Sequence, residues 1–128
     1  MDPRHLKRIK IVQNLFAHTF QSEESPFKMP HKEIKETEDV LKHQEEIDAH
    51  IHKFAPKYPL AKMGKLDTCI LRLALYELLF APEKEPMKVV INEAVEIAKE
   101  LGNERSFAFV NAVLGSIMSE INTNSTSS

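Results

Sequence analysis

Apolar side chains recur every three or four residues along most of this chain, which is the spacing of an amphipathic helix. The first such stripe lies in residues 4–21, and further stripes cover residues 33–55, 86–101 and the segment from Asn103 to residue 121. No segment shows the strict alternation of apolar and polar residues that is typical of strands. The pattern therefore predicts an all-α protein, folded as a helical bundle.

Residues 65–80 are apolar on nearly every side of the helix that they are predicted to form. A helix with so little polar surface belongs in the centre of a fold, where other helices cover all of its faces. Its apolar residues are Leu66, Cys69, Ile70, Leu71, Leu73, Ala74, Leu75, Leu78, Leu79 and Phe80.

Serines and prolines break the helical spacing in residues 22–32, which are predicted to form a loop. Gly102 suits a left-handed position that would close the helix over residues 86–101. Asn103 can then cap the next helix by accepting a hydrogen bond from a backbone N–H. The polar residues 122–128 have nothing to bury and are expected to be a disordered tail.

Length and composition indicate one soluble domain of 128 residues, with 42% hydrophobic and 28% charged residues. The single cysteine, Cys69, lies inside an apolar run, which predicts a buried and inert thiol. A lone free cysteine fits a reducing compartment. No apolar run reaches the ~18 residues of a membrane-spanning helix, and no signal peptide is visible. We therefore expect a cytoplasmic protein that makes no use of a membrane.

The charge is unevenly distributed. A net charge of −2 argues against a uniformly basic nucleic-acid binder, and residues 33–48 contain seven acids and two lysines. The N-terminus is different, because its basic residues have no acid among them and three of them share one helix face. Such a face attracts phosphates, although cations solvated beside a core stripe are an equal alternative. These basic residues are Arg4, His5, Lys7, Arg8 and Lys10.

Catalytic and metal-binding patterns are weak. Among His43, His50 and His52, none has a second histidine at the three- or four-residue spacing that two ligands on one helix face need. Glu46 and His50 have that spacing, but two ligands do not make a site, so these histidines are expected at the solvated surface. No glycine-rich phosphate loop is present. The sequence predicts no enzyme, no catalytic residue, no cofactor and no metal.

Helix angles give further expectations for polar and aromatic residues near the C-terminus. Glu93, Glu96 and Glu100 are expected to face solvent, and Asn92 projects away from the core face of its helix. Phe109 lies near the edge of its stripe, where an aromatic ring either packs against a neighbour or stacks on a base.

Several motifs resemble the NusB family of RNA-binding transcription antitermination factors. In chain order they are R-H-L-K-R-I-K-I-V-Q-N-L-F in residues 4–16, L-R-L-A-L-Y-E-L in Leu71–Leu78, P-M-K-V-V-I-N-E-A-V-E-I-A-K-E-L-G in Pro86–Gly102, and F-V-N-A-V-L in Phe109–Leu114. The last three motifs, over about residues 66–118, have an order and spacing similar to those of the family. The middle, roughly residues 22–60, looks shortened and matches poorly.

The resemblance implies a NusB-like RNA-binding domain over residues 1–121. That domain would consist of two small packed helical subdomains, of about residues 1–57 and 58–121. It implies binding of boxA-type single-stranded RNA from ribosomal RNA transcripts, together with ribosomal protein NusE, in the RNA polymerase antitermination complex. No catalysis is involved. Some members of the family self-associate through the surface used for NusE, so the resemblance also allows a homodimer.

The same resemblance implies roles for individual residues. Arg4, His5, Lys7 and Arg8, with Lys10 beside them, occupy the RNA-contacting stretch of the family. Arg105 and Phe109 lie where the C-terminal half contacts RNA, and Phe16 and Asp67 match positions near the partner-facing surface. Arg72 and Glu77 belong to the central motif, where salt bridges within a packed helix are an equal alternative to a functional role.

Two other hypotheses stay open. A NusB-like domain also forms the N-terminal part of certain ribosomal RNA cytosine methyltransferases, so the chain could be a stand-alone RNA-binding module of that type. It could also be a helical protein-interaction module that binds no RNA.

Overall fold

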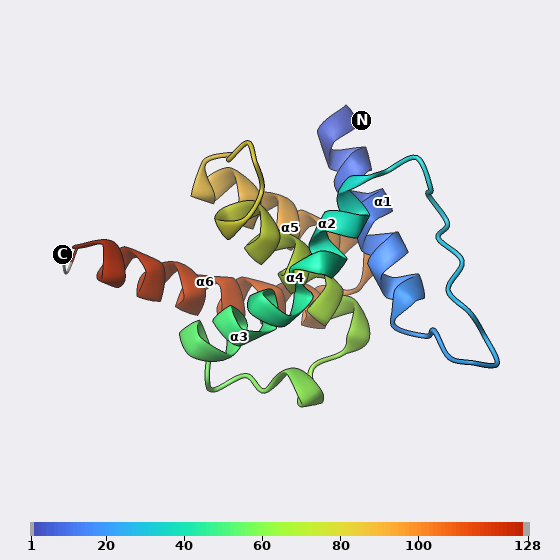
Figure 1. The fold of residues 1–128 in the computed structure, drawn as a ribbon. Coiled ribbons are helices and arrows are strands. Elements are labelled where there is room, and N and C mark those ends of the chain that lie inside the picture. Colours follow the sequence, from blue (N-terminus) through green and yellow to red (C-terminus); the bar gives the residue numbers. More distant parts are fainter. Residues whose placement is uncertain (1, 127–128) are drawn as a thin grey trace.

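The computed structural model describes residues 2–126, and these residues form α-helices, one short 3-10 helix and no strand. The prediction of an all-α bundle is therefore confirmed for the described part of the chain (Figure 1). In chain order the elements are α1 (Pro3–His18), α2 (Glu36–Lys42), α3 (Gln44–Phe54), η1 (Leu60–Lys62), α4 (Lys65–Leu79), α5 (Met87–Leu101) and α6 (Glu104–Thr126).

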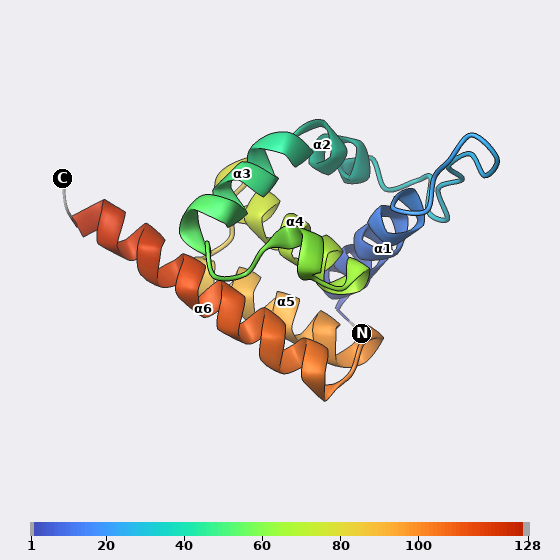
Figure 2. The same ribbon diagram turned by 90° about the horizontal axis from the view of Figure 1, so that it is seen from below.

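Helix α4 is the centre of the fold, as its apolar composition predicts. It contacts α1, α2, α3, α5 and α6. Figure 2 shows α5 and α6 packed side by side on one side of α4, with α2 and α3 on the other. Leu71 and Leu75 of α4 are fully buried, and Ile97 and Leu114 meet the core from α5 and α6. The predicted division into subdomains at residues 57 and 58 stays a prediction, because α4 packs on helices from both sides of it.

The single helix expected over residues 33–55 is two helices, which is a correction to the sequence prediction. The chain leaves helical geometry at His43, between α2 and α3, where φ is −96° and ψ is 6°. The ring Nδ1 of His43 lies 2.8 Å from the carbonyl oxygen of Asp39, and the ring packs 4.8 Å from that of Phe80. This side chain therefore competes for a helix carbonyl and is held by tertiary packing, which local spacing cannot reveal.

The turn between α5 and α6 is as short as predicted, but Gly102 is not left-handed. Its φ is −107°, and the need for glycine comes from space. A Cβ atom at Gly102 would lie 2.7 Å from Ser106 Oγ and 2.8 Å from the Ala98 carbonyl oxygen. The predicted cap is confirmed, because the Ser106 backbone N–H donates to Asn103 Oδ1 over 3.0 Å.

Helix α6 continues to Thr126, beyond the end expected near residue 121. The expected disordered tail thus begins inside a helix, and its residues 127–128 lie outside the described part of the chain. No described helix is long and apolar enough to span a membrane.

The loop over residues 19–35 is fastened to α1 by Asn14, whose side chain is fully buried. The amide oxygen of Asn14 accepts from the His31 backbone N–H over 2.8 Å, and its nitrogen donates to the His31 carbonyl over 3.0 Å. The same nitrogen donates to Thr37 Oγ1 over 2.9 Å. One side chain therefore sets where the end of the loop and the start of α2 lie against α1.

Candidate functional site

Each of the five basic residues predicted on α1 faces a carboxylate from another part of the chain. The acids come from the loop before α2, from α2 itself, from α4, from the turn before α5 and from α5. The cluster that looks uncompensated in the sequence is therefore compensated in space. The pairs are Arg4 with Glu85, His5 with Glu93 and Glu100, Lys7 with Glu36, Arg8 with Glu77, and Lys10 with Glu33.

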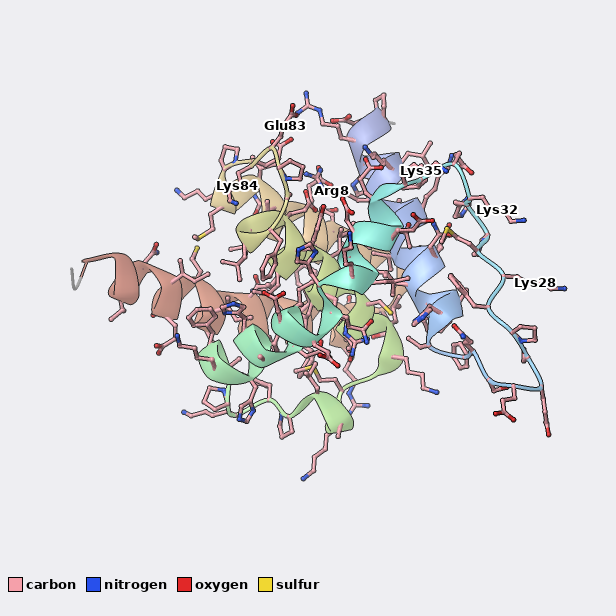
Figure 3. The ribbon with its side chains drawn as sticks, in the orientation of Figure 1. Arg8, Lys28, Lys32, Lys35, Glu83 and Lys84 are labelled. Atoms are coloured by element: carbon pink, nitrogen blue, oxygen red, sulfur yellow. The ribbon has the colours of Figure 1, made fainter. Side chains whose placement is uncertain are left out.

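Arg8 is a structural residue in this conformation, although the resemblance places it among RNA contacts. It is only 7% exposed, and Figure 3 shows it in the interior behind α2. Its Nε and Nη2 donate to both oxygens of Glu77 over 2.8–3.1 Å, and Nη1 lies 3.9 Å from Glu93. A guanidinium held in this way would have to leave the core before it could reach a phosphate.

His5 is clamped between two glutamates of α5, two turns apart. Its Nδ1 is hydrogen-bonded to Glu93, and its Nε2 lies 3.0 Å from Glu100. These hydrogen bonds raise the pKa of His5 above its usual value, so the ring favours the charged form. The expectation that Glu93 faces solvent is wrong for this reason, since its carboxylate lies against α1.

Arg72 and Glu77, whose roles the sequence leaves open, are both ion-pair partners. Arg72 donates from Nε and Nη2 to the two oxygens of Asp48, each over 2.9 Å, and so joins α4 to α3. Glu77 joins α4 to α1 through Arg8. Both residues therefore hold helices together.

Arg4, Lys7 and Lys10 form the accessible face of the α1 cluster. The Arg4 side chain is 73% exposed, and its Nη1 lies 3.2 Å from Glu85. Lys7 pairs with Glu36, and Lys10 lies 3.6 Å from Glu33. Pairs this exposed are worth about 0–1 kcal/mol, so a phosphate can replace the carboxylate at little cost. We call Arg4, Lys7 and Lys10 the outer face of α1.

A groove of about 390 Å³ lies between α1, α2 and the turn from α4 to α5. Its lining carries both charges, the cations Arg4 and Lys7 together with the acids Glu36, Glu83 and Glu85. Its mixed charge does not favour a polyanion inside it, so a phosphate chain would bind along the outer face of α1 instead.

The two residues predicted to contact RNA from the C-terminal half, Arg105 and Phe109, share one face of α6 because they are four residues apart. Arg105 is exposed and has no acidic partner among residues 2–126. Phe109 is half-buried, and its ring packs edge-on against Tyr58 at 5.7 Å. His5 links this region to α1, since its partner Glu100 lies five residues before Arg105.

Phe16 and Asp67, the predicted partner-binding residues, lie on different helices, Phe16 near the end of α1 and Asp67 in the first turn of α4. Phe16 is 37% exposed and packs edge-on against Phe20, which is 51% exposed. The ammonium of Lys65 lies 4.4 Å from the centre of the Phe20 ring. Asp67 lies two residues after Lys65, on the opposite face of α4, and its buried Oδ1 has no hydrogen-bond partner in the described residues. We call Phe16, Phe20 and Lys65 the aromatic surface.

The histidines expected at the solvated surface are in part buried, which corrects that expectation. His43 packs against Tyr76 and Phe80, and the ring of His50 stacks on Phe54 at 5.7 Å. Within residues 2–126 no group of three or more His, Cys, Asp or Glu side chains could hold a metal ion. Cys69 is fully buried as predicted, and burial raises the pKa of its thiol to about 11.

Three lysines that the sequence analysis did not single out lie on the loop beside α1. Lys28, Lys32 and Lys35 are exposed, and none of them has an ion-pair partner among the described residues. Local patterns do not reveal them, because this segment has no helical spacing and residues 33–48 read as acidic. Only the folded chain shows that the neighbouring Glu33 and Glu36 form ion pairs with Lys10 and Lys7 of α1.

The arrangement of helices and the order of the motifs agree with a comparison against protein families, in which the NusB family matches residues 5–119. The chain belongs to the NusB family. The transcription antitermination protein NusB of Elusimicrobium minutum is 43% identical over 81 residues, which cover 63% of this chain and 58% of that protein. The chain thus spans little more than half the length of the curated NusB proteins that it matches.

Solved NusB structures agree over more of the chain. The NusB structure from T. maritima is 32% identical, covers 92% of each chain and superposes with a TM-score of 0.73. A NusB structure in complex with NusE and double-stranded RNA is 24% identical, covers 90% of this chain and 96% of that one, and gives a TM-score of 0.65. The T. maritima structure confirms the NusB fold of this chain. The complex, at 24% identity, supports the fold alone.

Proposed function

We propose that this protein is a transcription antitermination factor that works as an RNA–protein adaptor. It binds boxA-type single-stranded RNA of ribosomal RNA transcripts together with ribosomal protein NusE, within the RNA polymerase antitermination complex of the cytoplasm. No catalytic step is part of this proposal. Membership of the NusB family supports it, as does the presence of NusE and RNA in the complex of a NusB with the same fold.

The observation that carries the proposal is the outer face of α1. Its three cations are accessible and held by pairs that cost little to exchange, whereas Arg8 and His5 behind them are fixed to α4 and α5. The phosphates of an RNA backbone can therefore replace the carboxylate partners of these three cations, while Arg8 and His5 keep α1 in place. Arg105 and Phe109 would continue the path, with the charge holding a phosphate and the aromatic edge contacting an unpaired base.

Replacing Arg4, Lys7 and Lys10 together by alanine is expected to weaken RNA binding and to flatten its dependence on salt. Each cation that no longer neutralises a phosphate of a single strand lowers the slope of log K against log salt by about 0.7, so the slope should fall by up to about 2. A fluorescence anisotropy titration with a boxA-like RNA and a scrambled RNA, each with and without NusE, measures both quantities.

The opposite change provides the control. Glu33→Gln with Glu36→Gln removes the carboxylates that face Lys10 and Lys7, so RNA affinity should rise. Equal affinity of wild type and both variants for the boxA-like RNA would rule out the outer face of α1 as an RNA-binding site.

We further propose that the aromatic surface and Asp67 bind NusE, and that a homodimer through the aromatic surface would exclude NusE. Asp67→Lys is expected to weaken NusE binding at least about tenfold, because it puts a cation in the place of an acid that a basic partner would contact. The measurement is calorimetric titration of NusE, with thermal unfolding to check the fold. Asp67→Asn keeps the shape of the side chain and should lie between the two. Undiminished NusE binding by Asp67→Lys would remove this residue from the interface.

A second candidate function is a helical protein-interaction module that binds no RNA. The observation in its favour is that every basic residue predicted on α1 already has a carboxylate partner. The two candidates differ in one measurement, since only the adaptor binds RNA more tightly when NusE is added.

A further inference from the structure

The loop over residues 19–35 presents three exposed lysines. Lys28, Lys32 and Lys35 are exposed, and no carboxylate in residues 2–126 pairs with them. Figure 3 shows Lys28 and Lys32 extending outward from the loop, with Lys35 where the loop enters α2. They differ from all five basic residues of the α1 cluster, each of which faces a glutamate. A phosphate would displace no ion pair at these three lysines.

The loop that carries them is held in place. The Asn14 amide is hydrogen-bonded to both the backbone N–H and the carbonyl of His31, the residue before Lys32. The His31 ring nitrogen Nε2 lies 2.6 Å from Gln13 Oε1. Nearer the tip, Phe27 packs edge-on against His18 at 5.0 Å, next to Lys28. Because the backbone is already positioned, a ligand would have to order only the lysine side chains, and that lowers the entropic cost of binding.

The loop lysines are continuous with the outer face of α1. Glu33 and Glu36 of this segment contact Lys10 and Lys7 of α1, and so join the two surfaces directly. The carboxylates of Glu33 and Glu36 thus face α1, while Lys28, Lys32 and Lys35 have no acidic partner among residues 2–126. The other two acids of the loop, Glu23 and Glu24, are exposed.

We propose that Lys28, Lys32 and Lys35 form a second cationic track that holds the backbone of the bound RNA beside α1. This inference rests on the proposed RNA-binding function and adds to it a second set of contacts. A lysine ammonium is a compact point charge, which binds a phosphate without reading a base. The track therefore fixes where the RNA lies and adds affinity, and it contributes equally to boxA-like and unrelated single strands.

The test is the triple variant Lys28→Gln, Lys32→Gln and Lys35→Gln, titrated with the boxA-like and scrambled RNAs over a range of salt concentrations. Removing three phosphate-binding cations should reduce the slope of log K against log salt by about 2 and the affinity by at least about tenfold at roughly 0.1 M salt. The loss should be the same for both RNAs, and the gain in affinity from NusE should be preserved, because the aromatic surface is untouched.

The matched control is Lys53→Gln, Lys62→Gln and Lys88→Gln, which changes the net charge by the same amount on α3, η1 and α5. It should change the slope little. A loop variant that binds as tightly as wild type, or that loses no more than this control, would overturn the second track and leave the proposed function standing. A loss confined to the boxA-like RNA would also overturn it, because phosphate contacts do not read sequence. A wild-type chain that binds neither RNA, with or without NusE, would overturn both.

Discussion

Replacing Arg8 by alanine will lower the free energy of unfolding by about 3 kcal/mol, with or without RNA. The change leaves the Glu77 carboxylate in the helix interface without the guanidinium from which both of its oxygens accept hydrogen bonds. Removing one partner of a buried ion pair costs roughly 3–5 kcal/mol, and the lower end applies because the Glu77 side chain is still 17% exposed. Urea unfolding followed by circular dichroism gives the value.

Two further variants separate an ion pair from a general effect of losing a cation. Arg4→Ala removes an exposed arginine of the same helix and should cost under about 1 kcal/mol. The double variant Arg8→Met with Glu77→Leu should recover most of the stability, because apolar residues of similar size can replace a buried pair. An Arg8→Ala variant as stable as wild type but unable to bind RNA would show that Arg8 contacts RNA and is not a structural residue.

Asn14→Ala should destabilise the protein by about 2–3 kcal/mol and release the loop over residues 19–35. The buried amide makes three hydrogen bonds, to both backbone groups of His31 and to Thr37 Oγ1, and each buried polar group left unpaired costs about 1–3 kcal/mol. The expected loss of stability is smaller than the full sum because His31 is half-buried, and water can replace the amide there.

Limited proteolysis gives a second readout for Asn14. Cleavage in residues 19–35 should be faster in Asn14→Ala than in wild type under conditions that keep both folded. The control is Gln13→Ala, which removes one exposed contact to the ring of His31 and should change stability by under about 0.5 kcal/mol. Equal cleavage of the loop in all three proteins would show that other interactions hold it.

Features that depend on local spacing were predictable from the sequence. Helix α4 is central because its residues are apolar on all faces, Asn103 caps α6 because it follows a helix end, and Cys69 is buried because it lies in an apolar run. The same reasoning could not find the break at His43, where a ring and a backbone carbonyl meet through tertiary packing. The reason predicted for glycine at position 102 was wrong, since the close approach of Ser106 requires it and φ does not.

The candidate site was harder to predict because charge compensation is a long-range property. The partners of Arg8 and His5 lie 69 and 88 residues away in the chain, so the N-terminal cluster looks free in the sequence and is paired in the fold. Lys28 and Lys32 do not stand out in the sequence for the opposite reason, since only folding shows which lysines have no ion-pair partner in the described residues. The resemblance to NusB predicts where the RNA-binding surface lies, and the structure shows which cations of the predicted surface are exposed.

The burial of Cys69 makes this protein well suited to site-specific labelling. The chain has one cysteine, and in the fold its thiol is inaccessible and stays protonated at neutral pH. A cysteine introduced at an exposed loop position such as Glu24 would therefore react with a maleimide dye far faster than the native thiol does. A fluorophore placed there, a few residues from Lys28, can report the arrival of RNA at the loop without any change to the core.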